Sequence, residues 1–218
     1  MWFWVVILLI LAILIYFVHS TKTDQYFDPY KICPQLKTIH ESREKIRKEI
    51  RQIYDWTDWP ETELYKNGEW KIFPFYAFGI WVNKNCEICP ELTEFIRRIP
   101  NLKLATLSRL SPGTKLAPHC GWGNHSNYVL RAHYGIDVPD NCYVEVESKR
   151  KYHKNDTWLL FDDSLQHMAG NESEKDRIVL IVDIERPTNI PKGKSTIGDT
   201  KELVEIVRYF RDNNLLQK

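Results

Sequence analysis

An alternating stretch near the middle of the chain is the best guide to the fold: Tyr128-Val129-Leu130-Arg131-Ala132-His133-Tyr134-Gly135-Ile136. Successive side chains of a β-strand point to opposite faces, so this stretch predicts a strand with a mostly apolar even-numbered face. Arg131 and His133 share the other face. If that face lies inside the protein, this basic pair needs an anion beside it.

Strand signals recur on both sides of this stretch. Aromatic and β-branched residues predict a strand over 70–82, and Ser111-Pro112-Gly113 predicts a turn between two later strands. The apolar run from Arg177 to Asp183 predicts another strand. Short strands with turns between them are typical of a mainly β barrel or sandwich.

Three helices are expected outside the strands, over residues 35–55, 90–99 and 201–212. In the first, apolar residues recur near helical spacing, which is more typical of core packing than of a partner site. The motif Trp56-Thr57-Asp58-Trp59-Pro60 should end that helix.

The N-terminal segment is apolar from Trp2 to Val18, at the lower end of the length that spans a bilayer as a helix. No Lys or Arg precedes it and no small-residue cleavage site follows, so a retained anchor is favoured over a cleaved signal peptide. Downstream lysines favour a cytoplasmic domain. Asn-x-Ser/Thr sequons at Asn124, Asn155 and Asn171 point to the opposite side.

Composition and charge set only broad limits on the number of domains and on the class of partner. The 218 residues provide one domain and a short extra element, and the net charge of +1 gives no electrostatic case for nucleic acid. The five cysteines are an odd number, which fits free thiols or one or two disulfides with one thiol left over.

Two histidines and an arginine form a candidate metal and anion site. His119, His167 and Arg177 are far apart in sequence, but strands that fold back on each other could bring them together. Imidazole binds iron, copper, nickel and zinc, and a guanidinium grips a carboxylate. Non-haem iron oxygenases add an Asp or Glu to two histidines, yet Gly121 occupies that position here.

Residues 60–187 resemble the aspartyl/asparaginyl β-hydroxylase family of Fe(II)- and 2-oxoglutarate-dependent oxygenases. Glycine at the carboxylate position, here Gly121, is part of the resemblance. The matching motifs are Leu107-Ser108-Arg109-Leu110-Ser111-Pro112-Gly113-Thr114, Pro118-His119-Cys120-Gly121, Leu130-Arg131-Ala132-His133-Tyr134-Gly135, Phe161-Asp162-Asp163-Ser164 with His167, and Arg177 to Asp183.

The resemblance implies roles for individual residues. His119 and His167 would be the Fe(II) ligands, and Arg177 with Ser108 would hold the distal carboxylate of 2-oxoglutarate. Arg131 and His133 would meet the proximal carboxylate near the metal, and they complete the catalytic set with the two ligands. O2 would be the second co-substrate. Asp162 and Asp163 are both candidates for orienting a ligand histidine.

Two departures from the family pattern concern the substrate. About three extra residues lie between His119 and His133, near Trp122-Gly123-Asn124-His125, where His125 is a third metal ligand or a solvated loop residue. Val129 stands where peptide-hydroxylating members tend to carry a basic residue. The target is therefore expected to be an aspartyl, asparaginyl or other protein side chain, or alternatively a lipid acyl chain.

Two readings compete with the enzyme. A binding module could keep the barrel and lose turnover, although intact His119, His167 and Arg177 argue against this. A zinc site could use Cys86 and Cys89 with Cys120 and the histidines, although a structural site usually has four ligands in two pairs and the chain has only one Cys-x-x-Cys.

The predicted fold is therefore mainly β (α+β), with a double-stranded β-helix, or cupin-like jelly roll, flanked by helices and preceded by a transmembrane helix. The expected divisions are a membrane anchor at 1–19, a linker and amphipathic helix at 20–59, the oxygenase-like domain at 60–187 and a helical extension at 188–218.

Overall fold

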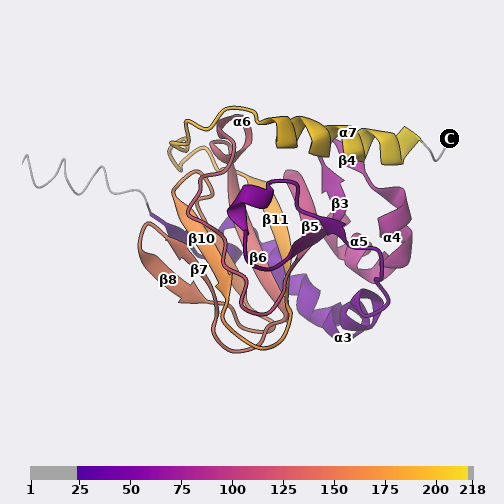
Figure 1. Ribbon diagram of the computed structural model, residues 1–218. Coiled ribbons are helices and arrows are strands. Elements are labelled where there is room, and N and C mark those ends of the chain that lie inside the picture. The colour runs from indigo at the N-terminus through magenta and orange to yellow at the C-terminus, as the bar shows by residue number, and fades with distance from the viewer. Residues whose placement is uncertain (1–23, 216–218) are drawn as a thin grey trace, which may run out of the picture.

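The computed structural model describes residues 24–215 (Figure 1). The predicted membrane anchor at residues 1–19 lies outside this range. Among residues 24–215, no helix is both long and apolar enough to cross a bilayer.

A large antiparallel sheet forms the centre of the molecule. Seven of its strands follow one path, and β4 (Ile80–Trp81) pairs with β3 beside it. The order along the path is β1 (Tyr26–Phe27), β9 (Trp158–Phe161), β6 (Val129–Asp137), β11 (Arg177–Glu185), β5 (Leu102–Leu110), β3 (Trp70–Ala77) and β2 (Thr57–Asp58).

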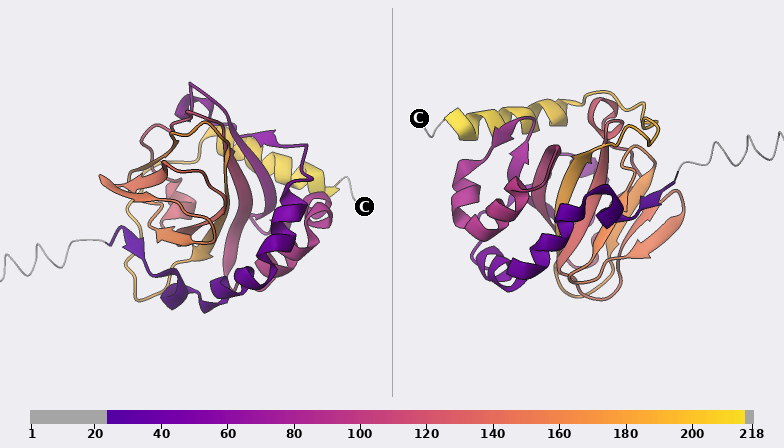
Figure 2. Two further views of the ribbon diagram at one scale, coloured as in Figure 1. Left: turned by 90° about the horizontal axis from the view of Figure 1, so that it is seen from below. Right: turned by 180° about the vertical axis from the view of Figure 1, so that it is seen from behind.

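A smaller antiparallel sheet lies against one face of the large one (Figure 2). Its order is β10 (His167–Asn171), β7 (Cys142–Val146) and β8 (Lys149–Tyr152). Val144 and Val146 of β7 pack against Phe161 of β9, which joins the two sheets. This two-sheet jelly-roll core confirms the predicted mainly β fold.

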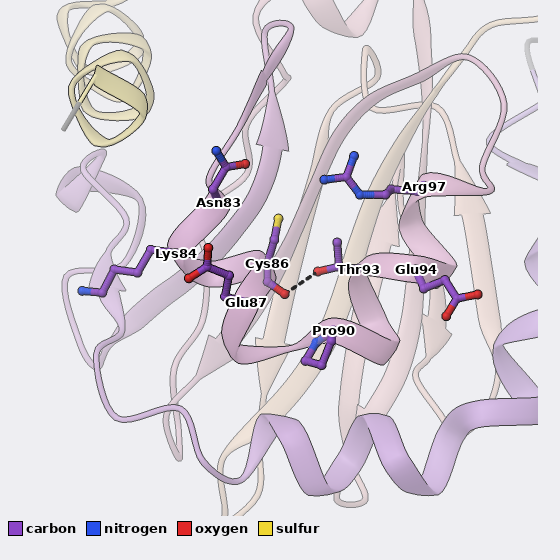
Figure 3. A pocket seen from close by; sticks show the side chains of 8 residues that line it. All are labelled: Asn83, Lys84, Cys86, Glu87, Pro90, Thr93, Glu94 and Arg97. Carbon is purple, nitrogen blue, oxygen red and sulfur yellow. Dashed lines mark hydrogen bonds between the residues drawn. The ribbon is translucent and has the colours of Figure 1, made fainter. Parts of the chain in front are cut away.

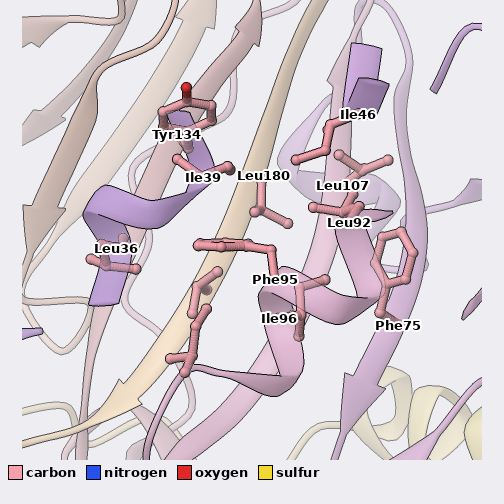
Figure 4. Close-up of a cluster of buried hydrophobic side chains, with 14 of the residues drawn as sticks. Leu36, Ile39, Ile46, Phe75, Leu92, Phe95, Ile96, Leu107, Tyr134 and Leu180 are labelled. Carbon is pink, nitrogen blue, oxygen red and sulfur yellow. The ribbon is translucent and has the colours of Figure 1, made fainter. Parts of the chain in front are cut away.

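Helices cover the other face of the large sheet (Figure 2). They are η1 (Pro34–Thr38), α3 (Ile39–Ile50), α4 (Asn83–Ile88) and α5 (Pro90–Arg97). Their apolar side chains meet alternate residues of the strands, such as Leu107, Tyr134 and Leu180 (Figure 4). Burial of these side chains removes apolar surface from water, the main favourable term in folding.

The remaining helices lie at the edges of the sheets. They are α2 (Pro29–Ile32), η2 (Thr62–Leu64), α6 (Gly123–Ser126) and α7 (Lys201–Leu215). Helix α7 runs across one end of the molecule beside β4, where Ile206 packs in a cluster with Ala77 and Val82 (Figure 1).

Three predicted elements differ from the structure. The helix expected over 35–55 begins as the 3-10 helix η1 and ends at Ile50, and beyond this end the Trp56 indole N–H donates to the Ile53 carbonyl. The strand expected over 70–82 is a hairpin: Phe78 and Gly79 both have positive φ and form its turn.

The strand expected after Ser111-Pro112-Gly113 forms only isolated bridges, at Lys115 and His119. Pro118 lacks an N–H, so a continuous ladder would lose a hydrogen bond there. This extended segment nevertheless delivers His119 to the edge of β10.

Candidate active site

Strand alternation places the predicted site residues between the two sheets. On β5, β6 and β11, the residues next to the helix-facing ones point inward, and six of the predicted side chains reach one cavity. They are Ser108, His119, Arg131, His133, His167 and Arg177. The cavity is narrow, with a volume of about 30 Å³.

The two predicted metal ligands lie side by side. His119 and His167 exchange backbone N–H···O hydrogen bonds of 2.9 and 2.8 Å, and their ring centroids are 4.3 Å apart. Each Nδ1 lies beside the carbonyl two residues earlier, at 2.8 Å from Ala117 and 2.9 Å from Leu165. A carbonyl can only accept, so each Nδ1 carries the proton and each Nε2 keeps a lone pair.

Both imidazoles are held in the uncharged form. Burial lowers the pKa of His119 to about 3 and that of His167 to about 4. A neutral imidazole with a bare Nε2 and an anchored Nδ1–H is the state that ligates a metal. The pair therefore fits a divalent transition metal through two nitrogen donors.

Gly121 is required by the geometry of the site. A Cβ at this position would collide with the Asp163 carboxylate, and the Gly121 N–H donates to the Asp163 carbonyl at 3.0 Å. A side chain at residue 121, a carboxylate ligand included, would therefore require Asp163 and Ser126 to shift. The carboxylate near the histidines comes instead from Asp163, whose Oδ1 lies 3.4 Å from His167 Nε2.

The structure separates the roles of Asp162 and Asp163. Asp162 forms a buried ion pair with Arg186, at 2.6 and 2.8 Å, and so belongs to the framework. Asp163 Oδ1 forms an ion pair of 2.6 Å with Arg131 Nη1. Burial raises the pKa of Asp163, because a buried carboxylate loses its hydration.

Arg131 is held between two buried carboxylates. Its Nε and Nη2 each donate to Asp183 at 2.8 Å, in addition to the pair with Asp163. Burial opposes the charge on Asp183, but Arg131 outweighs it and holds the pKa of that carboxyl well below its usual range. The guanidinium is thus positioned by Asp163 and Asp183 before any ligand binds.

His125 is partly buried against a carboxylate, so it is not a solvated loop residue. Its Nε2 lies 2.8 Å from Asp183 Oδ2, and only 16% of its side chain is exposed. The extra residues after His119 form α6, which turns His125 back onto the Arg131–Asp183 pair. The contact with Asp183 engages the His125 Nε2, so the third-ligand alternative gains no support from this arrangement.

Arg177 and Ser108 both line the cavity and carry hydrogen-bond donors. Arg177 is 2% exposed, and among the described residues its Nε and Nη1 have no hydrogen-bond partner. Burial lowers its pKa to about 10, so the guanidinium remains cationic at neutral pH. The Ser108 hydroxyl accepts from the Trp70 indole at 3.0 Å and can donate its own proton to a ligand. A buried, unpaired guanidinium calls for a carboxylate.

His153 and Asp183 are site residues that sequence reasoning missed. His153 follows β8 and lies 3.1 Å from His133, Nε2 to Nδ1. His153 lies in none of the motifs found in the sequence, and Asp183 ends the motif that begins at Arg177 but was given no role there. Their partners His133 and Arg131 are 20 and 52 residues away in sequence. The only available signal was the position of Asp183, on the same face of its strand as Arg177.

An open depression between α4 and α5 has a volume of about 670 Å³ and is lined by Cys86, Thr93 and Arg97 among others (Figure 3). Burial raises the pKa of the Cys86 thiol, so it stays protonated and is a poor nucleophile. All five cysteines are free. The described residues contain no group of three or more His, Cys, Asp and Glu that could hold a metal, so the zinc alternative gains no support.

The fold and site together define a jelly-roll protein with two metal-competent histidines beside an anion pocket. The sequence profile of the aspartyl/asparaginyl beta-hydroxylase family matches residues 40–187. The chain therefore belongs to this family, a family of hydroxylases, as the sequence motifs predicted.

Three relatives illustrate the range of the family. The ornithine lipid ester-linked acyl 2-hydroxylase of Rhizobium tropici is 34% identical over 56% of this chain and 43% of its own. Aspartate beta-hydroxylase domain-containing protein 2 of Mus musculus is 32% identical over 56% and 37%. Human aspartyl/asparaginyl beta-hydroxylase is 24% identical over 84% and 25%. The chain thus spans less than half the length of each relative.

Among solved structures, an oxidoreductase of the 2OG-Fe(II) oxygenase family from Burkholderia pseudomallei is similar with a TM-score of 0.48 and 10% identity. The similarity covers 76% of this chain and 93% of that one.

Proposed function

We propose that the chain is a membrane-anchored Fe(II)- and 2-oxoglutarate-dependent dioxygenase that hydroxylates a C–H bond of an aspartyl, asparaginyl or other protein side chain. The observation that carries the proposal is the convergence on one cavity of two imidazoles with bare Nε2 atoms and the unpaired guanidinium of Arg177. This arrangement suits a metal at one end and a carboxylate at the other.

His119 and His167 would hold Fe(II), and Arg177 with Ser108 would hold the distal carboxylate of 2-oxoglutarate. When bound, iron, 2-oxoglutarate and O2 together supply the oxidation that converts C–H to C–OH. A guanidinium clamp fixes the orientation of the acid, which lowers the entropy cost of reaching a reactive geometry. The surrounding apolar residues, such as Leu116, Val144 and Phe161, exclude water from the cavity.

Arg131 and His133 have different amounts of donor capacity left for the proximal carboxylate. Three of the five Arg131 N–H groups already face Asp163 and Asp183. His133 is 5% exposed, lines the cavity, and has no partner at Nε2 among the described residues. His133 is therefore the freer of the two to bind an incoming acid.

A lipid acyl chain is the second candidate substrate. Val129 lies on the same face of β6 as Arg131 and is 1% exposed, so the strand carries an apolar side chain there instead of a cation for a substrate carboxylate. The proposed anchor at residues 1–19 would hold the cavity near a bilayer, and the name of the Rhizobium tropici relative gives an acyl chain as its target.

The proposal is tested by titrating 2-oxoglutarate into the full-length chain in mild detergent, with and without Mn(II) as an oxygen-inert substitute for Fe(II). His167→Ala and Arg177→Ala should each abolish the metal-dependent binding. Arg98→Ala is the matched control, because Arg98 is an exposed arginine paired with Glu94 on the far side of the sheet. Binding that is independent of Mn(II), or unchanged in both site variants, would leave a jelly-roll binding module in place of an enzyme.

The substrate class is tested with the same protein loaded with Fe(II) and supplied with 2-oxoglutarate and O2. Peptides containing Asp or Asn are compared with ester- and amide-linked acyl lipids, and the gain of one oxygen atom is followed by mass spectrometry. Oxygen on the peptide alone supports the first substrate class. Oxygen on the lipid alone replaces it with the second.

A further inference from the structure

A buried pair of histidines lies behind the cavity. His133 Nδ1 and His153 Nε2 are 3.1 Å apart, and the rings are stacked with centroids 5.3 Å apart and planes 15° from parallel. Both residues are 5% exposed. Phe161 packs edge-on against the His133 ring, and the backbone N–H of His153 donates to the backbone carbonyl of Cys142 at 2.8 Å, which fixes the main chain at His153.

The pair shares one hydrogen, which leaves two arrangements. If His133 Nδ1–H donates to His153, then His133 Nε2 is a bare acceptor and would repel a carboxylate in the cavity. If His153 Nε2–H donates to His133, then His133 carries its hydrogen on Nε2 and presents a donor to the cavity. Only the second arrangement complements an acid.

The surroundings keep both rings uncharged. Burial and the nearby Arg177 guanidinium lower the pKa of His133 and of His153 well below the usual value. A neutral ring cannot donate from both nitrogens, so the hydrogen on His133 must be assigned to one nitrogen by its neighbour. Among the described residues, His153 is the neighbour that hydrogen-bonds His133 Nδ1.

A purely structural role would not need this pair. His133 Nε2 and His153 Nδ1 are both buried without a hydrogen-bond partner among the described residues. Buried polar atoms without partners cost free energy, and two apolar side chains of similar volume would avoid that cost. His133, whose Nε2 is the atom without a partner, lines the same cavity as Arg177.

We propose that His153 is a positioning residue that fixes His133 as the Nε2–H tautomer, so that an uncharged imidazole donates to the carboxylate of the acid co-substrate. This inference rests on the proposed function for the identity of the acid. His153 itself does not line the cavity, and it acts only through His133.

The first test reads the tautomer directly, without metal or ligand. Full-length protein labelled with 15N in its seven histidines is studied by NMR, with His133 assigned from a His133→Gln variant. The wild type should show a pyrrole-type signal for Nε2 of His133 and a pyridine-type signal for Nδ1. His153→Gln, whose amide N–H can take the place of the imidazole donor, should retain this pattern, whereas His153→Phe should lose it. A wild-type His133 protonated on Nδ1 would overturn the inference.

The second test measures 2-oxoglutarate affinity in the presence of Mn(II). His153→Phe should weaken binding about 10-fold, in the range of one hydrogen bond to a charged group, while His153→Gln should recover most of the affinity. Thermal unfolding of both variants verifies that they fold. Equal affinity in the wild type and His153→Phe would overturn the inference and leave the proposed function intact. Failure of the wild type to bind 2-oxoglutarate would overturn the proposed function, and the inference with it.

Discussion

The same strands form both faces of the large sheet, but one face packs against helices and the other lines the cavity. On the helix-covered face, Leu107, Leu130 and Leu180 are fully buried among apolar side chains. One residue further along the strands, Ser108 and Arg131 point to the opposite face, toward the cavity. The first face stabilises the fold by burial, whereas the second keeps polar groups buried and only partly satisfied. Stability and binding should therefore separate by face.

The largest expected effect is on the cavity face. Arg177→Leu removes the unpaired guanidinium, so affinity for 2-oxoglutarate with Mn(II) should fall about 100-fold or more, as for loss of a buried charge partner. The free energy of unfolding should stay equal or rise, because a buried cation without a partner is removed. Titration calorimetry and urea unfolding measure the two quantities. A strongly destabilised variant with normal affinity would reverse the assignment of the faces.

The matching change on the helix face is Leu107→Ala. It leaves a cavity in a fully buried cluster, so the free energy of unfolding should fall by about 3 kcal/mol. Affinity for 2-oxoglutarate should remain within about 2-fold of the wild type, since Leu107 points away from the site. Urea unfolding measures the free energy of unfolding and titration measures the affinity. A loss of affinity larger than that of Arg177→Leu would contradict the assignment of stability to the helix face and binding to the cavity face.

A smaller effect concerns pH. The pKa of His153 is lowered on folding, so between that value and the ordinary value near 6.5 the unfolded chain binds more protons. The contribution of neutral His153 is therefore present above about pH 6.5 and is lost as the pH falls below it. His153→Phe should reduce the pH slope of unfolding free energy by up to about 1 kcal/mol per pH unit below pH 6.5. Metal-free protein is unfolded with urea at several pH values, and identical slopes would contradict this expectation.

The smallest effect is expected next to Leu107, on the opposite face. Ser108→Ala removes one hydroxyl donor, so affinity for 2-oxoglutarate should fall about 5-fold, while stability changes by about 1 kcal/mol or less. The same two measurements apply. If Ser108→Ala and Leu107→Ala gave the same pair of results, strand alternation would not explain the division of roles.

Much of this division could be read from the sequence. The alternation in residues 128–136 correctly predicted β6 and the shared face of Arg131 and His133, and the structure shows that this face lines the cavity. The run from Arg177 was correctly predicted as a strand. Chain breaks were harder to predict, because the turn at Phe78-Gly79 depends on backbone torsions within an otherwise continuous apolar run.

The supporting contacts of the site could not be predicted, because they join residues distant in sequence. Glycine at position 121 was recognisable as a departure from the usual metal triad, but its steric reason requires Asp163 beside it. The engagement of His125 by Asp183 and of His133 by His153 likewise arises only when strands and loops meet in space. Local sequence patterns predict which face of a strand a side chain occupies, but its hydrogen-bond partners are determined by the tertiary structure.

The central claim is that His119 and His167 bind a metal in the same cavity that binds a carboxylate. We would test it by measuring Mn(II) affinity by electron paramagnetic resonance, in the full-length wild type and in His119→Gln, with and without 2-oxoglutarate. Because coupled sites strengthen each other reciprocally, 2-oxoglutarate should tighten Mn(II) binding in the wild type and have little effect in His119→Gln. Mn(II) binding that is weak in both proteins and indifferent to 2-oxoglutarate would contradict the account.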